Sequence, residues 1–193
     1  MYSLTMSTRT RLVSVTQDLL WERGYAATSS KQIRDRAEAG QGSMYHHFSN
    51  KKELAKTALE QSAAAMRAEA ETLLAEEGTA TERVIAYLKR QRDSLRGCRM
   101  GRMTYDADVL ATPELLRPVA ETLGWIVDAL ADVVRQGLEA GEFPPETDPR
   151  QLASMVVATV QGGYVLARAQ QDPAAFDAAV AGAASLLQGQ ARQ

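Results

Sequence analysis

The chain has 193 residues, of which 45% are hydrophobic and 24% are charged, and its formal net charge is −2. This composition is ordinary for a globular protein, and the length fits one two-part unit better than several independent domains. A single cysteine, Cys98, excludes an intramolecular disulfide framework. No apolar run approaches the ~20 residues of a membrane span, and residues 1–11 lack an apolar core of signal-peptide length, so the cytoplasm is the expected compartment.

Basic residues are concentrated at the N-terminal end. Residues 1–52 contain eight Lys or Arg against four Asp or Glu, a local charge of +4 that leaves −6 for the remainder. A basic module suits DNA, because contacts with phosphate supply most of the non-specific affinity. Charge asymmetry alone is weak support for DNA binding, and it becomes informative only together with a DNA-binding motif.

The first predicted helix covers residues 8–23, where apolar residues recur at helical spacing and Gly24 ends the pattern. A second helix is predicted after Ser29, which has capping-box spacing to Gln32. Its inner face carries Ile33 and Ala37. We expect the first helix to pack across the second and the one that follows it.

A third helix is predicted at residues 41–47, after a turn that Gly40 permits. Met44 and Phe48 are four residues apart and point inward, so the polar residues of this helix face outward. A helix, a short turn and a second helix with an exposed polar face form a helix-turn-helix arrangement.

The stretch GSMYHHFSNKKEL, which ends at Leu54, resembles the signature of the TetR/AcrR family of regulators, in which the recognition helix ends in Tyr-x-x-Phe followed by a lysine. The Gly24-Tyr25 pair and Thr28 fit the same pattern, and the resemblance covers about residues 8–54. Glu38 stands where the family usually has a glycine, a variant similar to that of a branch of multidrug-efflux regulators.

The resemblance implies which residues contact DNA. Gln41, Gly42 and Ser43 open the recognition helix, where base edges are read, and glutamine suits adenine. The residues expected near phosphate are Ser30, Lys31, Tyr45, His46 and Lys51.

The remaining chain is predicted to be helical throughout, because no segment alternates with a period of two residues. A long Ala-rich helix is expected from Lys51 to about Glu76, and it is the expected link between two modules. Later helices are predicted over 79–96, within 97–111, over 112–141, from Asp148 and from Asp172. The expected fold is therefore all-α with about nine helices, with a helix-turn-helix DNA-binding domain at 1–50 and a ligand-binding and dimerisation domain at 51–193.

The last two predicted helices are rich in small residues, which permit close helix approach. We expect them to form a two-fold dimer interface, as the resemblance also implies; a tight helix pair within one chain is the alternative. The interface residues named on this basis are Gly162, Gly163, Phe176, Val180, Ala183 and Leu187.

Aromatic residues and methionines of the larger module suit a pocket for a small, mainly apolar effector, although any single one of them is more readily explained as core. The candidate ligand-binding residues are Tyr87, Met103, Tyr105, Trp125, Gln161 and Tyr164.

Cys98 has arginines as neighbours, which favour a thiolate, and similar regulators with a Gly-Cys-x-x-Gly element include redox sensors. A buried, inert cysteine is the competing interpretation. His46 and His47 are adjacent on a helix and point in different directions, so no metal site is expected. No cofactor and no catalytic constellation are expected either.

These patterns together predict a dimeric repressor that binds a palindromic DNA operator and is released by a small apolar ligand. The alternatives are a thiol or electrophile sensor acting through Cys98 and, from another class, a helical enzyme or an adaptor that does not bind DNA.

Overall fold

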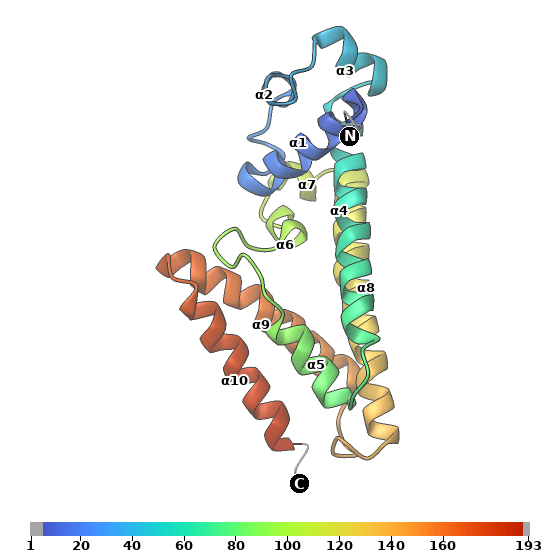
Figure 1. Cartoon of the computed structure of the whole chain (residues 1–193), viewed down its shortest axis with the longest axis vertical. Coiled ribbons are helices and arrows are strands. Elements are labelled where there is room, and N and C mark those ends of the chain that lie inside the picture. Colours follow the sequence, from blue (N-terminus) through green and yellow to red (C-terminus); the bar gives the residue numbers. More distant parts are fainter. Residues whose placement is uncertain (1–5, 191–193) are drawn as a thin grey trace, which may run out of the picture. The chain divides into compact units, whose positions relative to one another are not determined.

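A computed structural model describes residues 6–190, which form ten helices and no strand (Figure 1). The all-helical prediction is therefore confirmed. There is one helix more than expected because the segment 97–111 forms two short helices, α6 (Arg99–Met103) and α7 (Ala107–Leu110). Part of the N-terminal segment considered for a signal peptide, residues 1–5, lies outside the described residues.

The chain divides into two units by its internal contacts. The N-terminal unit contains residues up to Ala64 together with Arg99–Glu121, and the C-terminal unit contains Ala65–Cys98 and the chain from Thr122 onward. Helices α4 (Lys51–Leu74) and α8 (Pro113–Glu139) contribute residues to both units. This division differs from the boundary expected after residue 50, because the segment 99–121 belongs with the helix-turn-helix residues.

In the N-terminal unit, α1 (Thr8–Arg23) packs against α2 (Ser30–Arg36), α3 (Gln41–His47) and α6. Each helix supplies apolar side chains at helical spacing to a small shared core. The buried members from the first three helices and their C-terminal flanks are Leu12, Val13, Leu19, Leu20, Ile33, Ala37, Met44 and Phe48. This core fixes α3, whose opposite face is exposed.

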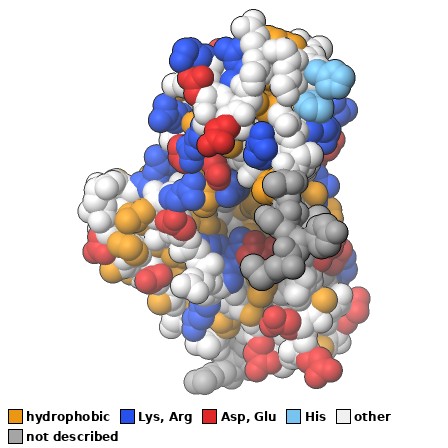
Figure 2. Space-filling view, turned by 45° about the horizontal axis from the view of Figure 1, so that its top comes forward, with side chains coloured by type: hydrophobic (Ala, Val, Ile, Leu, Met, Phe, Trp, Pro, Cys, Tyr) orange, Lys and Arg blue, Asp and Glu red, His pale blue; other side chains and the backbone are white. Residues whose placement is uncertain are grey.

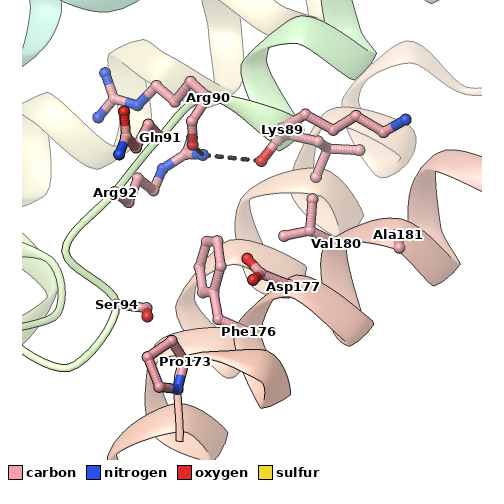
Figure 3. A pocket seen from close by; sticks show the side chains of 11 residues that line it. Lys89, Arg90, Gln91, Arg92, Ser94, Pro173, Phe176, Asp177, Val180 and Ala181 are labelled. Atoms are coloured by element: carbon pink, nitrogen blue, oxygen red, sulfur yellow. Dashed lines mark hydrogen bonds between the residues drawn. The ribbon is translucent and has the colours of Figure 1, made fainter.

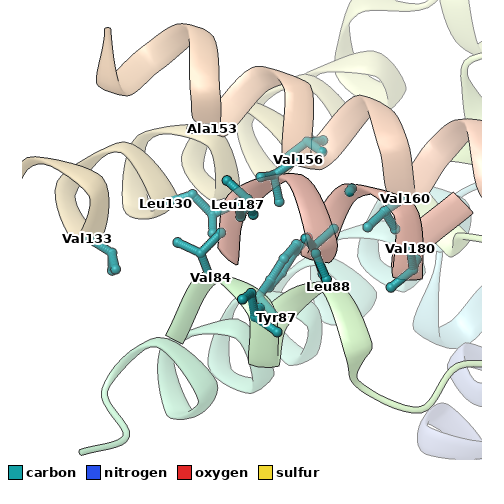
Figure 4. Packing of buried hydrophobic residues seen from close by; sticks show 14 of the residues in the cluster. Val84, Tyr87, Leu88, Leu130, Val133, Ala153, Val156, Val160, Val180 and Leu187 are labelled. Atoms are coloured by element: carbon teal, nitrogen blue, oxygen red, sulfur yellow. The ribbon is translucent and has the colours of Figure 1, made fainter. Parts of the chain in front are cut away.

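In the C-terminal unit, α10 (Ala174–Gln190) packs against both α9 (Pro149–Gln170) and α5 (Ala80–Lys89). Figure 4 shows side chains from these helices and from α8 meeting in one core. The labelled core residues are Val84, Tyr87, Leu88, Leu130, Val133, Ala153, Val156, Val160, Val180 and Leu187.

Helix α5 ends at Lys89, several residues before the end expected near Arg96. The side chain of Arg92 explains the early end, because its guanidinium donates hydrogen bonds to the carbonyl oxygens of Tyr87, Leu88 and Arg90 at 2.6–3.0 Å. These carbonyls belong to the last turn of α5 and to the residue after it, where no further helical N–H is available to them.

The close approach of α9 and α10 occurs within one chain. A Cβ atom at Gly163 would lie 2.8 Å from the ring of Phe176, so this glycine makes room for the ring. A Cβ at Gly162 would meet no atom within 4 Å. Of the pair of glycines, only Gly163 is thus required by packing inside the subunit.

This packing corrects most of the expected dimer interface. The side chains of Phe176, Val180, Ala183 and Leu187 are at most 6% exposed and belong to the core of one subunit. Gly163 is buried against Phe176 in the same core. They are buried because they lie on the face of α10 that packs on α9 and α5. Gly162 alone among the expected residues lies on an exposed face.

Among the described residues, helix α9 alone is long and apolar enough, by length and composition, to cross a membrane. It has 22 residues, and an 18-residue window within it has a mean hydropathy of 1.2. The sequence carries no charged residue between Arg150 and Arg168. One face of the helix packs into the core described above, and its other face keeps exposed apolar side chains.

Candidate DNA-binding site

The start of α2 is fixed by the capping box that the sequence predicts. The Ser29 hydroxyl accepts a hydrogen bond from the Gln32 backbone N–H at 3.2 Å, and the Gln32 side chain accepts one from the Ser29 N–H at 2.8 Å. Two of the N–H groups that a helix start leaves without partners are thereby satisfied.

The turn between α2 and α3 passes through Glu38, whose φ of 50° lies in the left-handed region. Ala39 N–H then bonds back to the Arg34 carbonyl at 3.0 Å. A residue with a Cβ is strained in this conformation and glycine is not. Glu38, which stands where the family usually has a glycine, is thus the residue of this turn at which glycine would be less strained.

Helix α3 begins after Gly40 and presents its polar side to solvent. Gln41, Gly42 and Tyr45 are exposed, and Ser43 is half-buried. Met44 on the opposite side is completely buried. In Figure 2 the two histidines mark this helix, and Lys and Arg side chains lie near them.

Two arginines of α1 hold the turn and the end of α3. Arg11 donates from Nε to the Ala37 carbonyl at 3.2 Å, and the Arg9 guanidinium lies 5.3 Å from the centre of the Phe48 ring. Specific contacts on the inner side of the motif therefore hold α3 in place and leave its start exposed. A binding surface needs such support to be rigid.

Ser30 and Lys31 lie at the start of α2, as expected. Lys31 pairs with Asp35 at 2.6 Å, and both side chains are more than half exposed. An exposed pair at this spacing contributes only a few tenths of a kcal/mol, about 0.3–0.5, so it leaves Lys31 available for a phosphate.

Lys51 was expected at a phosphate, and the structure gives its ammonium group other partners. Nζ donates to the carbonyl oxygens of Tyr25 at 3.1 Å and Thr28 at 2.9 Å, and it lies 3.8 Å from the centre of the Tyr25 ring. Burial lowers the pKa of Lys51, against the opposing effect of Asp108 and Asp106. Lys51 thus joins the first turn of α4 to the segment between α1 and α2.

Asp106, which the sequence analysis did not single out, joins the same segment to α7. Its Oδ2 accepts a hydrogen bond from the Ala26 backbone N–H at 2.9 Å, and its Oδ1 accepts the N–H groups of Asp108 and Val109. A Cβ at Gly24 would lie 2.7 Å from Oδ2, and Gly24 has a φ of 86°. The position of Asp106 before the α7 helix can be recognised in the sequence as a helix cap. Its hydrogen bond to Ala26, which is 80 residues away, cannot.

His46 and His47 have ring centres 5.0 Å apart with planes at 66° to each other. His46 is exposed and His47 is half-buried. The described residues contain no group of three or more His, Cys, Asp or Glu side chains that could hold a metal ion.

The expected ligand-binding residues do not form one group. Met103 and Tyr105 belong to the N-terminal unit, where Met103 is completely buried and Tyr105 is 79% exposed. These two positions correct the expectation, because one is sealed in the core and the other projects into solvent. The other four, Tyr87, Trp125, Gln161 and Tyr164, belong to the C-terminal unit.

A polar cluster in the C-terminal unit was missed by the sequence analysis. Its centre is Arg92, with the ring of Tyr87 5.2 Å away and the ring of Phe176 5.9 Å away. The Tyr164 ring lies 4.9 Å from that of Phe176, and burial raises the pKa of Tyr164 to about 12. An arginine in a loop gives no periodic signal, so the sequence did not reveal it.

Cys98 is half-buried and packs against the core of the C-terminal unit. Gly97 before it has a φ of 81°, and a Cβ there would lie 3.6 Å from the side chain of Arg168. Cys98 is thus neither fully sealed in the core nor fully exposed.

Comparisons with known proteins agree with this architecture. Residues 12–58 match the model for bacterial regulatory proteins of the tetR family, and residues 78–183 match the tetracyclin repressor-like C-terminal domain. An uncharacterized HTH-type transcriptional regulator of Mycobacterium tuberculosis is 27% identical over 179 residues, which cover 88% of each chain.

Solved structures show the same fold. A TetR-family regulator from Cytophaga hutchinsonii has a TM-score of 0.85 at 23% identity, covering 98% of this chain and 99% of that one. A TetR regulator from Chloroflexus aurantiacus has a TM-score of 0.84 at 26% identity, covering 95% of each chain. The reduced form of Escherichia coli NemR has a TM-score of 0.81 at 22% identity, covering 92% and 95%. With both of its parts matched by family models, the chain belongs to the TetR family of helix-turn-helix transcriptional regulators.

Proposed function

We propose that this regulator is a homodimeric, non-enzymatic cytoplasmic repressor that binds a palindromic DNA operator and leaves it when a small molecule binds the C-terminal unit. The observation that carries the proposal is the start of α3, where Gln41, Gly42 and Ser43 stand on the outer side of a helix whose inner side is anchored by Met44. Such a helix has the length and polarity to enter a major groove.

The residues of this surface have different proposed roles in DNA binding. Gln41 reads a base edge, and Gly42 lets the backbone approach closely. Tyr45, His46, Ser30 and Lys31 contact phosphates and set the register. Lys51 is reassigned from phosphate contact to holding the N-terminal unit together.

The proposed dimer uses an exposed apolar surface of the C-terminal unit, which we call the α9–α10 strip. Its residues are Met155, Gly162, Val165 and Leu166 on α9 and Gly182 and Leu186 on α10. The four large side chains are 37–71% exposed. Exposed apolar side chains that recur on one face of a helix suit an interaction site, and a two-fold pairing of this strip with itself would bury them.

The proposed effector has a mainly apolar body, because Tyr87, Tyr164 and Phe176 border the polar cluster around Arg92. An effector releases DNA only if it binds the DNA-incompetent arrangement more tightly than the competent one. Helices α4 and α8 contribute to both units and give such coupling a continuous route along the chain.

The DNA-binding proposal is tested by selecting bound fragments from a random duplex library with the full chain. The enriched sequence is expected to contain two inverted half-sites about 34–36 Å apart, or a multiple of this spacing. Fluorescence anisotropy should then show tighter, salt-dependent binding to the selected duplex than to a scrambled one. Enrichment of no common sequence, with equal affinity for both duplexes, would refute the proposal.

A further inference from the structure

The C-terminal unit contains a cavity of about 500 Å³ between the segment that follows α5 and the first turns of α10 (Figure 3). This volume lies in the range of sites for small organic molecules. Phe176 and Val180 give the α10 side an apolar surface, and Arg92 faces Phe176 from the loop side. Apart from Asp177, the α10 wall is thus apolar, and the opposite wall carries cations.

The charges around the cavity are unequal. Three cations, Lys89, Arg90 and Arg92, line it against one acid, Asp177. Arg90 already pairs with Glu69 at 2.5 Å. Neither Lys89 nor Arg92 forms an ion pair with a carboxylate of the described residues, so the cavity has an excess of uncompensated positive charge.

Arg92 is the most informative of the three cations, because its side chain is half-buried and has no counter-charge. Its guanidinium donates hydrogen bonds to three neutral backbone carbonyls, and its charge faces the rings of Tyr87 and Phe176. Burial lowers the pKa of Arg92, which expresses the cost of keeping this charge away from water. A charge that is partly removed from water gains from a partner of opposite sign, and an anion in the cavity would supply one.

We propose that this cavity is a binding site for a small organic carboxylate, whose anionic end contacts Arg92 and whose apolar or aromatic body lies against Phe176 and Val180. Arginine suits this role because its planar guanidinium can present two N–H groups to a carboxylate. The inference builds on the proposed effector-binding role of the C-terminal unit and names the chemical class of the effector.

The site is separate from the proposed dimer surface on the same helix. Asp177 and Leu186 are nine residues apart, which is about two and a half helical turns, so they point to opposite sides of α10. Ala181 likewise borders the cavity and not the α9–α10 strip. Dimerisation through the strip therefore leaves the cavity open to a small molecule.

The test measures binding of benzoate to the full chain without DNA by isothermal titration calorimetry, with neutral benzamide and inorganic phosphate as matched probes. Benzoate is expected to bind once per chain and at least about tenfold more tightly than either comparison probe, because only benzoate has both the charge and the apolar ring. Equal affinities of benzoate and benzamide, equal affinities of benzoate and phosphate, or no heat from benzoate at millimolar concentration would overturn the proposal.

Three variants locate the site. Arg92→Gln should weaken benzoate about tenfold or more, because the anion loses its partner. Asp177→Asn should strengthen it about two- to fivefold by removing a like charge, an effect that misfolding would not produce. Ala181→Phe should abolish binding by filling the cavity while leaving Arg92 in place. Unchanged affinity in folded Arg92→Gln, or in both Asp177→Asn and Ala181→Phe, would place benzoate elsewhere and overturn the proposal.

A second measurement separates this inference from the proposed function. Benzoate at saturating concentration is added to the chain bound to its selected duplex. Release of the duplex by the unmodified chain, but not by the Ala181→Phe variant, would support both the carboxylate site and the repressor mechanism. If benzoate binds in the calorimeter but releases no duplex, the carboxylate site stands and its role as the effector site is refuted.

Discussion

The ammonium group of Lys51 lies 3.8 Å from the centre of the Tyr25 ring and donates hydrogen bonds to the carbonyl oxygens of Tyr25 and Thr28. This lysine therefore joins the start of the long helix α4 to the segment that leads into the helix-turn-helix. A position expected to contact DNA thus also holds two segments of the N-terminal unit together.

Replacing Lys51 with Met should lower the free energy of unfolding by about 1–2 kcal/mol, because two carbonyls lose a charged donor and the ring loses a cation. Urea denaturation followed by circular dichroism measures the loss. Lys52→Met is the matched control, since Lys52 forms a solvent-exposed pair with Glu114 at 2.8 Å, and such pairs contribute little to stability. Equal losses in the two variants would contradict the assigned role of Lys51.

The strained turn gives a second stability prediction. Glu38→Gly should raise the free energy of unfolding by about 0.5–1 kcal/mol, because glycine adopts a φ of 50° without strain, although its freer unfolded chain offsets part of the gain. Thermal melts of the two proteins would show the difference. Glu38→Ala removes the carboxylate and keeps a Cβ, so a similar gain there would attribute the effect to charge and not to the turn.

Local features of this fold could be predicted from the sequence because they depend on neighbours along the chain. The Ser29–Gln32 capping box and the inward spacing of Met44 and Phe48 both follow from helical geometry. The helix-turn-helix, and the family resemblance carried by it, rest on such short-range patterns.

Features that depend on distant partners could not be predicted in the same way. Nothing adjacent to Asp106 indicates that it binds the Ala26 N–H, and nothing near Arg92 indicates that it ends α5. The small residues of α9 and α10 correctly predicted that helices approach closely there, and the structure shows this approach within one chain. The sequence could not distinguish Gly163, which makes room for Phe176, from Gly162, which does not.

A pair of glycines in α8 tests this distinction between required and dispensable glycines. A Cβ at Gly137 would lie 2.6 Å from both the Ala80 Cβ and the Phe143 ring, whereas one at Gly124 would meet nothing within 4 Å. Gly137→Ala should therefore cost about 1–3 kcal/mol through overpacking. Gly124→Ala should stabilise by up to about 1 kcal/mol, because alanine favours the helix. Denaturant titrations that gave the same sign for both variants would contradict the packing argument.

The proposed reading of DNA predicts different consequences for two exposed residues. Gln41→Ala should reduce discrimination at one base position per half-site by about 1–3 kcal/mol, because a base-edge contact is lost. Lys31→Gln should weaken all duplexes alike and reduce the slope of log K against log salt by about 1, because a phosphate contact is lost. Anisotropy titrations over a set of single-base operator variants at several salt concentrations would separate the two. If both substitutions caused the same sequence-independent loss, α3 would not be the base-reading helix.

The proposed dimer surface gives the last prediction. Leu186 is 71% exposed on α10, so Leu186→Glu should leave the fold of each subunit intact. In the dimer the same substitution would place a carboxylate within an apolar contact, and an unpaired buried charge costs several kcal/mol, roughly enough to dissociate a dimer of ordinary affinity. Sedimentation velocity should therefore show a monomer with an unchanged circular dichroism spectrum.

Gln188→Glu is the matched control, because Gln188 is also exposed on α10 but lies two residues, or about 200°, around the helix from Leu186. This variant should remain a dimer and bind the selected duplex normally. Leu186→Glu should lose affinity for the full palindrome, since each monomer can then hold only one half-site. A Leu186→Glu protein that sedimented as an unchanged dimer would show that subunits pair through another surface, and the α9–α10 strip would then need a different partner.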